Sequence, residues 1–335
     1  MKKFFKILGI LLLVLVILAL AAAGTAYHYY TDALKPADPD GKSESQIIEI
    51  KQGMYAGEIA QMLEDKKLIK SALAFRIMMR LDEKGGDIKT GHFKISPQDT
   101  PDKILDILIK GDTLKKKITF PEGLTLEQTI ALVKEKNVCD AAKFRELVTY
   151  EGKAFGNFPA RLEGYLLPDT YEIPWVCSAN ELVTIMTSRF DELARPLWNE
   201  KSPLPFSDTI VLASLVEREA QVASERPLIA GVYVNRLRDK MLLECDATIQ
   251  YALGKQKEIL LYSDLKIDSP YNTYKYPGLP PGPICCPGTA AIEAACHPKS
   301  SPYYYYVRND VKGDGSHVFS KNFAEHNRAI AKYQR

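Results

Sequence analysis

Two glutamates, Glu217 and Glu219, carry the most suggestive chemistry in this chain. They lie in the segment 209–222, TIVLASLVEREAQV, whose apolar spacing predicts a helix. At about 100° per residue, Glu219 falls within the apolar stripe and Glu217 on the opposite side. A carboxyl group on an apolar face is partly desolvated, so its pKa rises towards the range of a general acid. We therefore expect Glu219 to be catalytic; the alternative is a buried glutamate that only bonds an arginine or backbone N–H groups.

A second set of side chains could bind a saccharide, because aromatic rings offer flat apolar faces to sugars and polar groups bond their hydroxyls. They come from three segments, 162–171, 245–251 and 269–274. Asp246 and Gln250 lie one helical turn apart and could face one cleft, unless Asp246 simply caps its helix. The candidate substrate-binding residues are Glu163, Tyr165, Asp246, Thr248, Gln250, Tyr271, Asn272, Thr273 and Tyr274.

The segment 278–284, GLPPGPI, follows the last of these residues. Proline and glycine at this density exclude a helix or a central strand, so we expect a rigid, ordered loop. Such a loop either lines a substrate groove or serves only as a structural crossover.

The N-terminus predicts a membrane helix. Lys2, Lys3 and Lys6 precede an uncharged, apolar run over residues 7–27, and about 20 such residues cross a hydrocarbon core. Lysines before the run place the N-terminus in the cytoplasm and the rest of the chain outside, as in a single-pass protein of the cytoplasmic membrane. A cleaved signal peptide is the alternative, but the length of the run favours an uncleaved anchor.

The remaining composition is that of a globular protein. The chain has 335 residues with 46% hydrophobic residues and a net charge of +2, which gives no basic footprint for nucleic acid. Its six cysteines lack the spacing of a metal site. We therefore expect no metal, no cofactor and no nucleic-acid partner.

The order of apolar patterns predicts an α+β fold with two folded parts. Residues 1–27 form the cytoplasmic tip and transmembrane helix, 28–46 a polar tether, 47–117 a small α+β subdomain, and 118–335 a larger α+β catalytic domain. The strand–glycine–helix pattern at 48–69 resembles a LysM module, a small fold that binds glycans containing N-acetylglucosamine. The alternative is an ordinary small α+β unit.

Four motifs, in order, resemble those of the membrane-bound endolytic murein transglycosylase (YceG-like) family. In that family the catalytic glutamate is the second acid of the V-E-x-E motif, which is Glu219 here. The chain departs from the family pattern at Cys245 and Ala247, where Thr and Pro are common, and at Cys285–Cys286; these changes bear on the shape of the groove. These four motifs are LEGYLLPDTYEI, VEREAQVASERPLIAGVYVNRLR, CDATIQYALG and SPYNTYKYPGLPPGPI, and a matching Ala-Cys-His-Pro step follows them at 295–298.

The resemblance implies cleavage of the β-1,4 bond between N-acetylmuramic acid and N-acetylglucosamine in nascent peptidoglycan strands near the membrane, which limits strand length. Glu219 would protonate the glycosidic oxygen and then accept the proton of the muramoyl C6 hydroxyl, which closes a 1,6-anhydro ring. Peptidoglycan synthases are candidate partners. Two alternatives stay open: a muramidase that uses Glu219 with Asp246 or Glu163 as a second carboxylate, and a non-enzymatic wall-binding scaffold.

Overall fold

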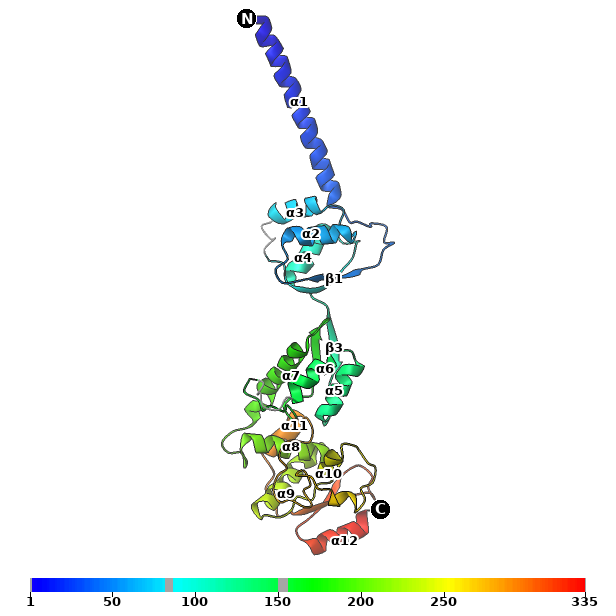
Figure 1. The fold of residues 1–335 in the computed structure, drawn as a ribbon, viewed down its shortest axis with the longest axis vertical. Helices are drawn as coiled ribbons and strands as arrows, with labels where there is room; N and C mark the ends of the chain where they lie inside the picture. The colour runs from blue at the N-terminus through cyan, green and yellow to red at the C-terminus, as the bar shows by residue number, and fades with distance from the viewer. Residues whose placement is uncertain (1, 82–86, 150–155, 335) are drawn as a thin grey trace. The chain divides into compact units, whose positions relative to one another are not determined.

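The computed structural model describes residues 2–81, 87–149 and 156–334. The chain divides into two compact units, Met1–Lys116 and Lys117–Arg335 (Figure 1). Helices make up about half of the described residues, and short two-stranded sheets pair β1 with β2, β3 with β4 and β5 with β6. The predicted α+β class is confirmed.

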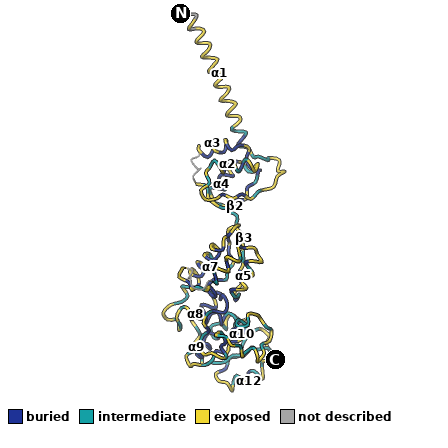
Figure 2. The backbone as a smooth tube through the Cα atoms, in the orientation of Figure 1, coloured by how far each residue is buried: buried dark blue, intermediate teal, exposed yellow. Residues whose placement is uncertain are grey.

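Helix α1, Lys2–Ala33, is long and apolar enough to cross a membrane. Its side chains from Lys6 to Tyr29 are exposed (Figure 2). The end of the helix differs, because Ala33 is buried and Leu34 packs against the core of the first unit. The helix therefore continues through residues 28–33, the first part of the segment for which the sequence predicts a tether.

The first unit contains a small α+β fold whose elements match the predicted pattern. Strand β1 pairs antiparallel with β2, and Ile48 lies opposite Phe93. Thr100 followed by Pro101 predicts a helix start, and the structure confirms it, because Thr100 accepts a hydrogen bond from the backbone N–H of Lys103. The elements are β1 (Gln46–Ile50), α2 (Ala56–Asp65), α3 (Ala72–Leu81), β2 (Gly91–Ile95) and α4 (Pro101–Lys110).

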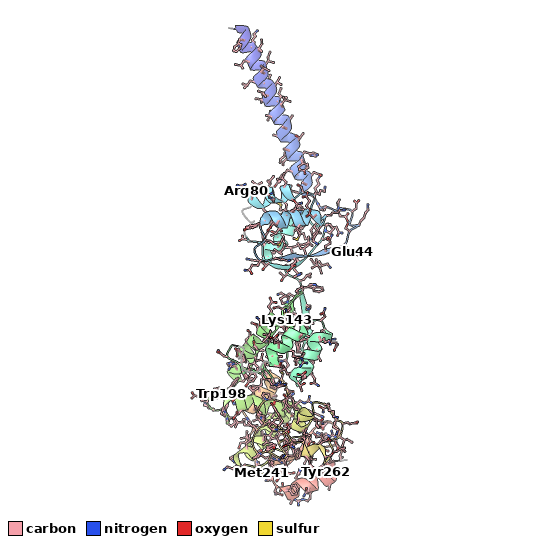
Figure 3. All side chains as sticks on the ribbon, viewed as in Figure 1. Glu44, Arg80, Lys143, Trp198, Met241 and Tyr262 are labelled. Carbon is pink, nitrogen blue, oxygen red and sulfur yellow. The ribbon has the colours of Figure 1, made fainter. Side chains whose placement is uncertain are left out.

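The second unit begins with a mixed α+β layer. Thr125 and Gln128 form a capping box at the start of α5, and Ser178 and Glu181 form another at the start of α7. Trp198, labelled in Figure 3, lies after α7 and packs edge-on against the ring of Phe206. The elements are β3 (Lys115–Thr119), α5 (Leu126–Glu135), α6 (Ala141–Thr149), β4 (Thr170–Pro174), α7 (Ala179–Leu193) and the 3₁₀ turn Arg195–Leu197.

Helix α8, Phe206–Glu219, is the central element of the second unit. Residues 209–216 are all buried, because α9, α10 and α11 pack around the helix. The single apolar stripe expected from the sequence therefore understates the burial of α8. The helix ends at Glu219, because Ala220 adopts an extended conformation, so the predicted extension to Val222 is wrong.

Two consecutive apolar helix patterns, at 209–222 and after Ser224, predict a helical hairpin, and the structure confirms it. A 3₁₀ turn, Ala223–Glu225, joins α8 to α9, Arg226–Arg238, which carries Pro227 in its first turn. Ser224, three residues before Pro227, predicts an N-cap for this helix. This prediction is wrong, because Glu225 precedes α9 and makes no side-chain cap bond.

The residues after α9 form the remaining elements of the second unit. No helix or strand is assigned over residues 267–288, as the proline and glycine content predicts. Helix α11 packs on α8 and α9, and α12 packs on β5 and β6. The elements are α10 (Asp246–Leu253), the 3₁₀ turn Asp264–Lys266, α11 (Thr289–Cys296), β5 (Tyr305–Arg308), β6 (His317–Ser320) and α12 (Phe323–Tyr333).

Candidate active site

Glu219 is the last residue of α8, and its half-buried carboxyl group receives hydrogen bonds from two other elements. The thiol of Cys245, just before α10, donates to Oε1 over 3.2 Å. The hydroxyl of Tyr306, on β5, donates to Oε2 over 3.1 Å. The backbone N–H of Ala247 adds a third donor. Three segments distant in sequence thus converge on one carboxyl group.

Burial raises the pKa of Glu219, and the nearby charge of Asp246 raises this pKa further. The bonds from Cys245, Tyr306 and Ala247 lower it, without cancelling the rise. The position at the C-terminal end of α8 acts in the same direction as burial, because the helix dipole is negative there. Glu219 therefore keeps a proton to a higher pH than an exposed glutamate, as a general acid requires.

Tyr306 belongs to a small network of tyrosines that the sequence did not reveal. Its hydroxyl lies 2.7 Å from the hydroxyl of Tyr233 on α9, and the two rings meet edge to face at 6.2 Å. Burial, then the charge of Glu219, raise the pKa of Tyr306 well above its usual value, so its hydroxyl stays protonated and donates. The only sequence signal was the run of four tyrosines at 303–306, which does not say which ring faces Glu219.

Cys245 is held by residues that we expected to bind substrate. Its backbone N–H donates to Oγ1 of Thr273 over 3.0 Å, and its carbonyl accepts from Thr248 over 2.7 Å. The hydroxyls of these two threonines lie 2.9 Å apart. Both side chains are buried, so the structure places Thr248 and Thr273 beneath the site, where they fix the start of α10.

Two residues of the loop 269–274 make polar contacts: Tyr274 bonds a surface residue, and Asn272 is buried. Tyr274 donates to Oδ1 of Asp246 over 2.6 Å, and Asp246 is the exposed first residue of α10. Asp246 does not cap the helix, because Cys245 precedes α10 and no side-chain cap bond forms there. Asn272 is fully buried and donates to the carbonyls of Leu265 and Ile267, which holds the loop in shape.

Glu163 lies inside the second unit, with 2% of its side chain exposed. It accepts hydrogen bonds from the backbone N–H of Leu126 (2.7 Å), from the hydroxyl of Tyr251 (2.9 Å) and from Arg161 (3.2 Å). Burial raises the pKa of Glu163 despite these donors. Its contacts tie α5 to α10, so its position is that of a structural anchor at the floor of a cavity.

Of the other expected binding residues, Tyr165 and Tyr271 pack against aromatic rings, and Gln250 lines the cavity next to Glu163. Tyr165 packs its ring against Phe158 and Phe190 in the hydrophobic core. Tyr271 packs against Tyr251 with ring centres 4.8 Å apart. Gln250 lines the cavity and bonds the backbone of residue 257 in both directions, over 2.8 Å each.

A cavity of about 330 Å³ neighbours this site, although Glu219 itself is not among its lining residues. Arg218, the residue before Glu219, lines it, as does Ala247, whose N–H bonds Glu219. The full lining consists of Thr125, Glu127, Gln128, Arg161, Glu163, Arg218, Ala247, Gln250, Tyr251, Gly254, Lys255, Gln256 and Ile284.

Glu217 is nearly as close in sequence but has a different environment. Only 7% of its side chain is exposed, Oε2 accepts from the backbone N–H of Gly288 over 3.0 Å, and Oε1 lies 3.5 Å from Arg226. Glu217 thus joins α8 to the start of α11 and to α9. The helix presents its two carboxyl groups to different neighbours, as the sequence spacing predicts.

Comparison with known proteins agrees with the motifs. The sequence profile of the YceG-like family matches residues 48–332. The endolytic murein transglycosylase of Bacillus subtilis (strain 168) is 33% identical over 332 residues, which cover 92% of this chain and 90% of the relative. That of Streptococcus pneumoniae (strain D39) is 32% identical, and the match covers 95% of this chain but 64% of the longer streptococcal protein.

A solved structure extends the comparison to the fold. The crystal structure of a yceG-like protein from Listeria monocytogenes is similar with a TM-score of 0.56 and 32% identity, covering 85% of this chain and 98% of the Listeria chain. The profile match spans most of the second unit and the small fold of the first. This chain belongs to the YceG-like family.

Proposed function

We propose that this protein is an endolytic lytic transglycosylase of peptidoglycan and that Glu219 is its acid and base. The observation that carries the proposal is the carboxyl group of Glu219, which is half-buried, has a raised pKa and receives three hydrogen bonds. The relatives from Bacillus and Streptococcus carry the name of this activity.

The reaction needs one group that first gives a proton and then takes one. Protonated Glu219 donates to the oxygen of the β-1,4 bond between N-acetylmuramic acid and N-acetylglucosamine, and the bond from that oxygen to C1 of the muramoyl residue breaks. The C6 hydroxyl oxygen then bonds to C1 and gives its proton to Glu219, which closes the 1,6-anhydro ring without consuming water. Cys245 and Tyr306 stabilise the carboxylate formed between these steps, because each donates to one of its oxygens.

A muramidase remains the second candidate, because Asp246 lies close enough to Glu219 to raise its pKa. A hydrolase of this kind needs a second carboxylate that acts as nucleophile or activates water. Asp246 is exposed and suits that role better than Glu163, whose carboxyl group is enclosed and fully bonded.

We further propose that α1 anchors the protein in the cytoplasmic membrane with its N-terminus inside and both folded units outside. The contact of Leu34 with the small core leaves little free chain after the helix, which would hold the first unit near the membrane surface. Glycan binding by the LysM-like part and an association with peptidoglycan synthases belong to the same proposal. Together they favour cleavage of nascent strands, which limits strand length.

Mass spectrometry of products from uncrosslinked glycan strands, in water enriched in ¹⁸O, tests the proposal. We expect fragments with 1,6-anhydro ends and no ¹⁸O from the wild type, and none from Glu219→Gln. Glu217→Gln is the matched control and should cleave within a few-fold of wild type, because an amide oxygen still accepts from Gly288. Reducing ends that contain ¹⁸O would identify the muramidase. No fragmentation above a protein-free control, by either the wild type or Glu219→Gln, would leave only a wall-binding scaffold.

A further inference from the structure

The cavity beside Glu219 is rich in cationic hydrogen-bond donors. Arg161, Arg218 and Lys255 contribute three positive charges to its lining. Glu127 and Glu163 contribute carboxyl groups. The cavity attracts anions more strongly if neighbouring residues neutralise these two carboxyl groups.

Both carboxyl groups already accept hydrogen bonds from neighbouring residues. Arg145 binds both oxygens of Glu127 over 2.7 Å each, from outside the lining. Glu163 is enclosed by its donors, and burial raises its pKa, which favours the uncharged form. The charge that the cavity presents is consequently positive.

The cations keep donors for a ligand. Arg218 uses one N–H on the carbonyl of Gly123 (3.1 Å) and another on Gln256 (2.7 Å), and a guanidinium has five N–H groups. Arg161 bonds Glu163 and Tyr251 through one nitrogen, Nη2. Lys255 is exposed and adds a mobile ammonium group at the end of α10. Guanidinium groups of this kind bind planar carboxylates through paired hydrogen bonds.

We propose that this cavity is a subsite for a carboxylate of the peptide stem on the glycan strand, an inference that rests on the proposed function. Glu219 is not part of the lining, but Arg218, which precedes it in the chain, and Ala247, whose N–H bonds it, both are. We therefore assign the cavity to the stem on the lactyl group of a muramoyl residue bound at Glu219. The volume of about 330 Å³ lies at the lower end of small-ligand pockets. The side-chain NH2 group of Gln128, also in the lining, can donate to the carbonyl groups of a peptide.

Lys255→Gln is the variant of choice, because an exposed lysine after α10 contributes little to folding. We compare kcat/KM on strands that carry stems with kcat/KM on strands stripped of stems by an amidase. The wild type should prefer stem-bearing strands, and Lys255→Gln should reduce this preference roughly three- to tenfold through KM, with Lys255→Glu reducing it more. Lys266→Gln, an exposed lysine outside the lining, should leave the preference as in the wild type.

A binding measurement separates this proposal from the proposed function. Titration of the full-length Glu219→Gln variant with free stem peptide should show saturable binding that weakens in Glu219→Gln/Lys255→Gln and at high salt. Binding without any cleavage by the wild type would overturn the proposed function alone. Cleavage with equal kcat/KM on both kinds of strand, or competition by inorganic pyrophosphate but not by stem peptide, would overturn the subsite.

Discussion

The hydroxyl of Tyr306 donates a hydrogen bond to Glu219, a residue 87 positions away in the sequence. Tyr306 on β5 reaches the last residue of α8, and its hydroxyl also bonds the hydroxyl of Tyr233 on α9. It gives Glu219 a donor that stabilises its charged form within a site that otherwise favours the neutral form. The balance between burial and donors sets the pH range over which Glu219 holds a proton.

Tyr306→Phe should move that balance towards the neutral form. Loss of the donor raises the pKa of Glu219 further, so the alkaline limb of the kcat/KM–pH profile moves to higher pH. We expect kcat to fall roughly ten- to a hundredfold, because a bond to a charged group is worth about 1.5–3 kcal/mol when the carboxylate forms. Tyr304→Phe is the control, since its hydroxyl bonds Asp239 at the surface, and its profile should match wild type. An unshifted limb in Tyr306→Phe would mean that the bond does not act on Glu219.

Two substitutions of Cys245 should shift the kcat/KM–pH profile in opposite directions. Cys245→Ala removes a donor to Oε1 and should move the alkaline limb to higher pH. Cys245→Thr replaces a weak thiol donor by a hydroxyl and should move the limb to lower pH. The pH profiles of the two variants bracket that of the wild type if the thiol donates to Glu219. Shifts in the same direction would indicate a packing effect instead.

The raised pKa of Glu219 also links stability to pH. A carboxyl group whose pKa is higher in the folded than in the unfolded chain binds more protons when folded, so its contribution to stability is lost as pH rises through the folded pKa. Glu219→Gln should therefore raise the Tm of the second unit at pH 8, by roughly 2–4 °C for each kcal/mol. The gain should disappear near pH 4. Thermal unfolding at both pH values measures it, and an equal gain at both would rule out titration as its origin.

The sequence identified local features of the site better than long-range ones. The helical hairpin, the two faces of Glu217 and Glu219, and the ordered loop after residue 269 all follow from periodicity and from proline and glycine, which act over a few residues. Tyr306 was missed, because no local pattern reveals which strand residue meets a helix end. The hydroxyls of Thr248 and Thr273 predict a role in substrate binding, but in the structure these hydroxyls bond each other and the backbone of Cys245.

Glu163 illustrates the same limit and yields a further prediction. An amide at this position cannot accept all three hydrogen bonds, from Leu126, Tyr251 and Arg161. Glu163→Gln should lower the free energy of unfolding by roughly 1–3 kcal/mol, since a buried donor loses its partner. Urea unfolding measures this loss, with the exposed Glu293→Gln as control. A stable Glu163→Gln protein with impaired substrate binding would instead support the direct role in binding that the sequence suggested.

Gly231 on α9 lies where the chain leading to β5 approaches most closely. A Cβ at this position would lie 2.3 Å from the backbone carbonyl oxygen of Lys299. Alanine usually stabilises a helix by about 1 kcal/mol relative to glycine, but displacing backbone in a packed core costs about 1–3 kcal/mol. We therefore expect Gly231→Ala to be destabilising overall.

The displacement also bears on catalysis, because the segment after Lys299 leads to β5 and Tyr306. Gly231→Ala should lower both the Tm of the second unit and kcat, although Gly231 makes no contact with Glu219 among the bonds described here. Gly57→Ala is the matched control, since Gly57 lies in helix α2 and a Cβ there meets only the end of the Arg76 side chain at 3.8 Å. It should stabilise the first unit slightly and leave kcat unchanged. If the Gly231→Ala protein is as stable and active as the wild type, the backbone at Lys299 can move without cost and does not determine the position of Tyr306.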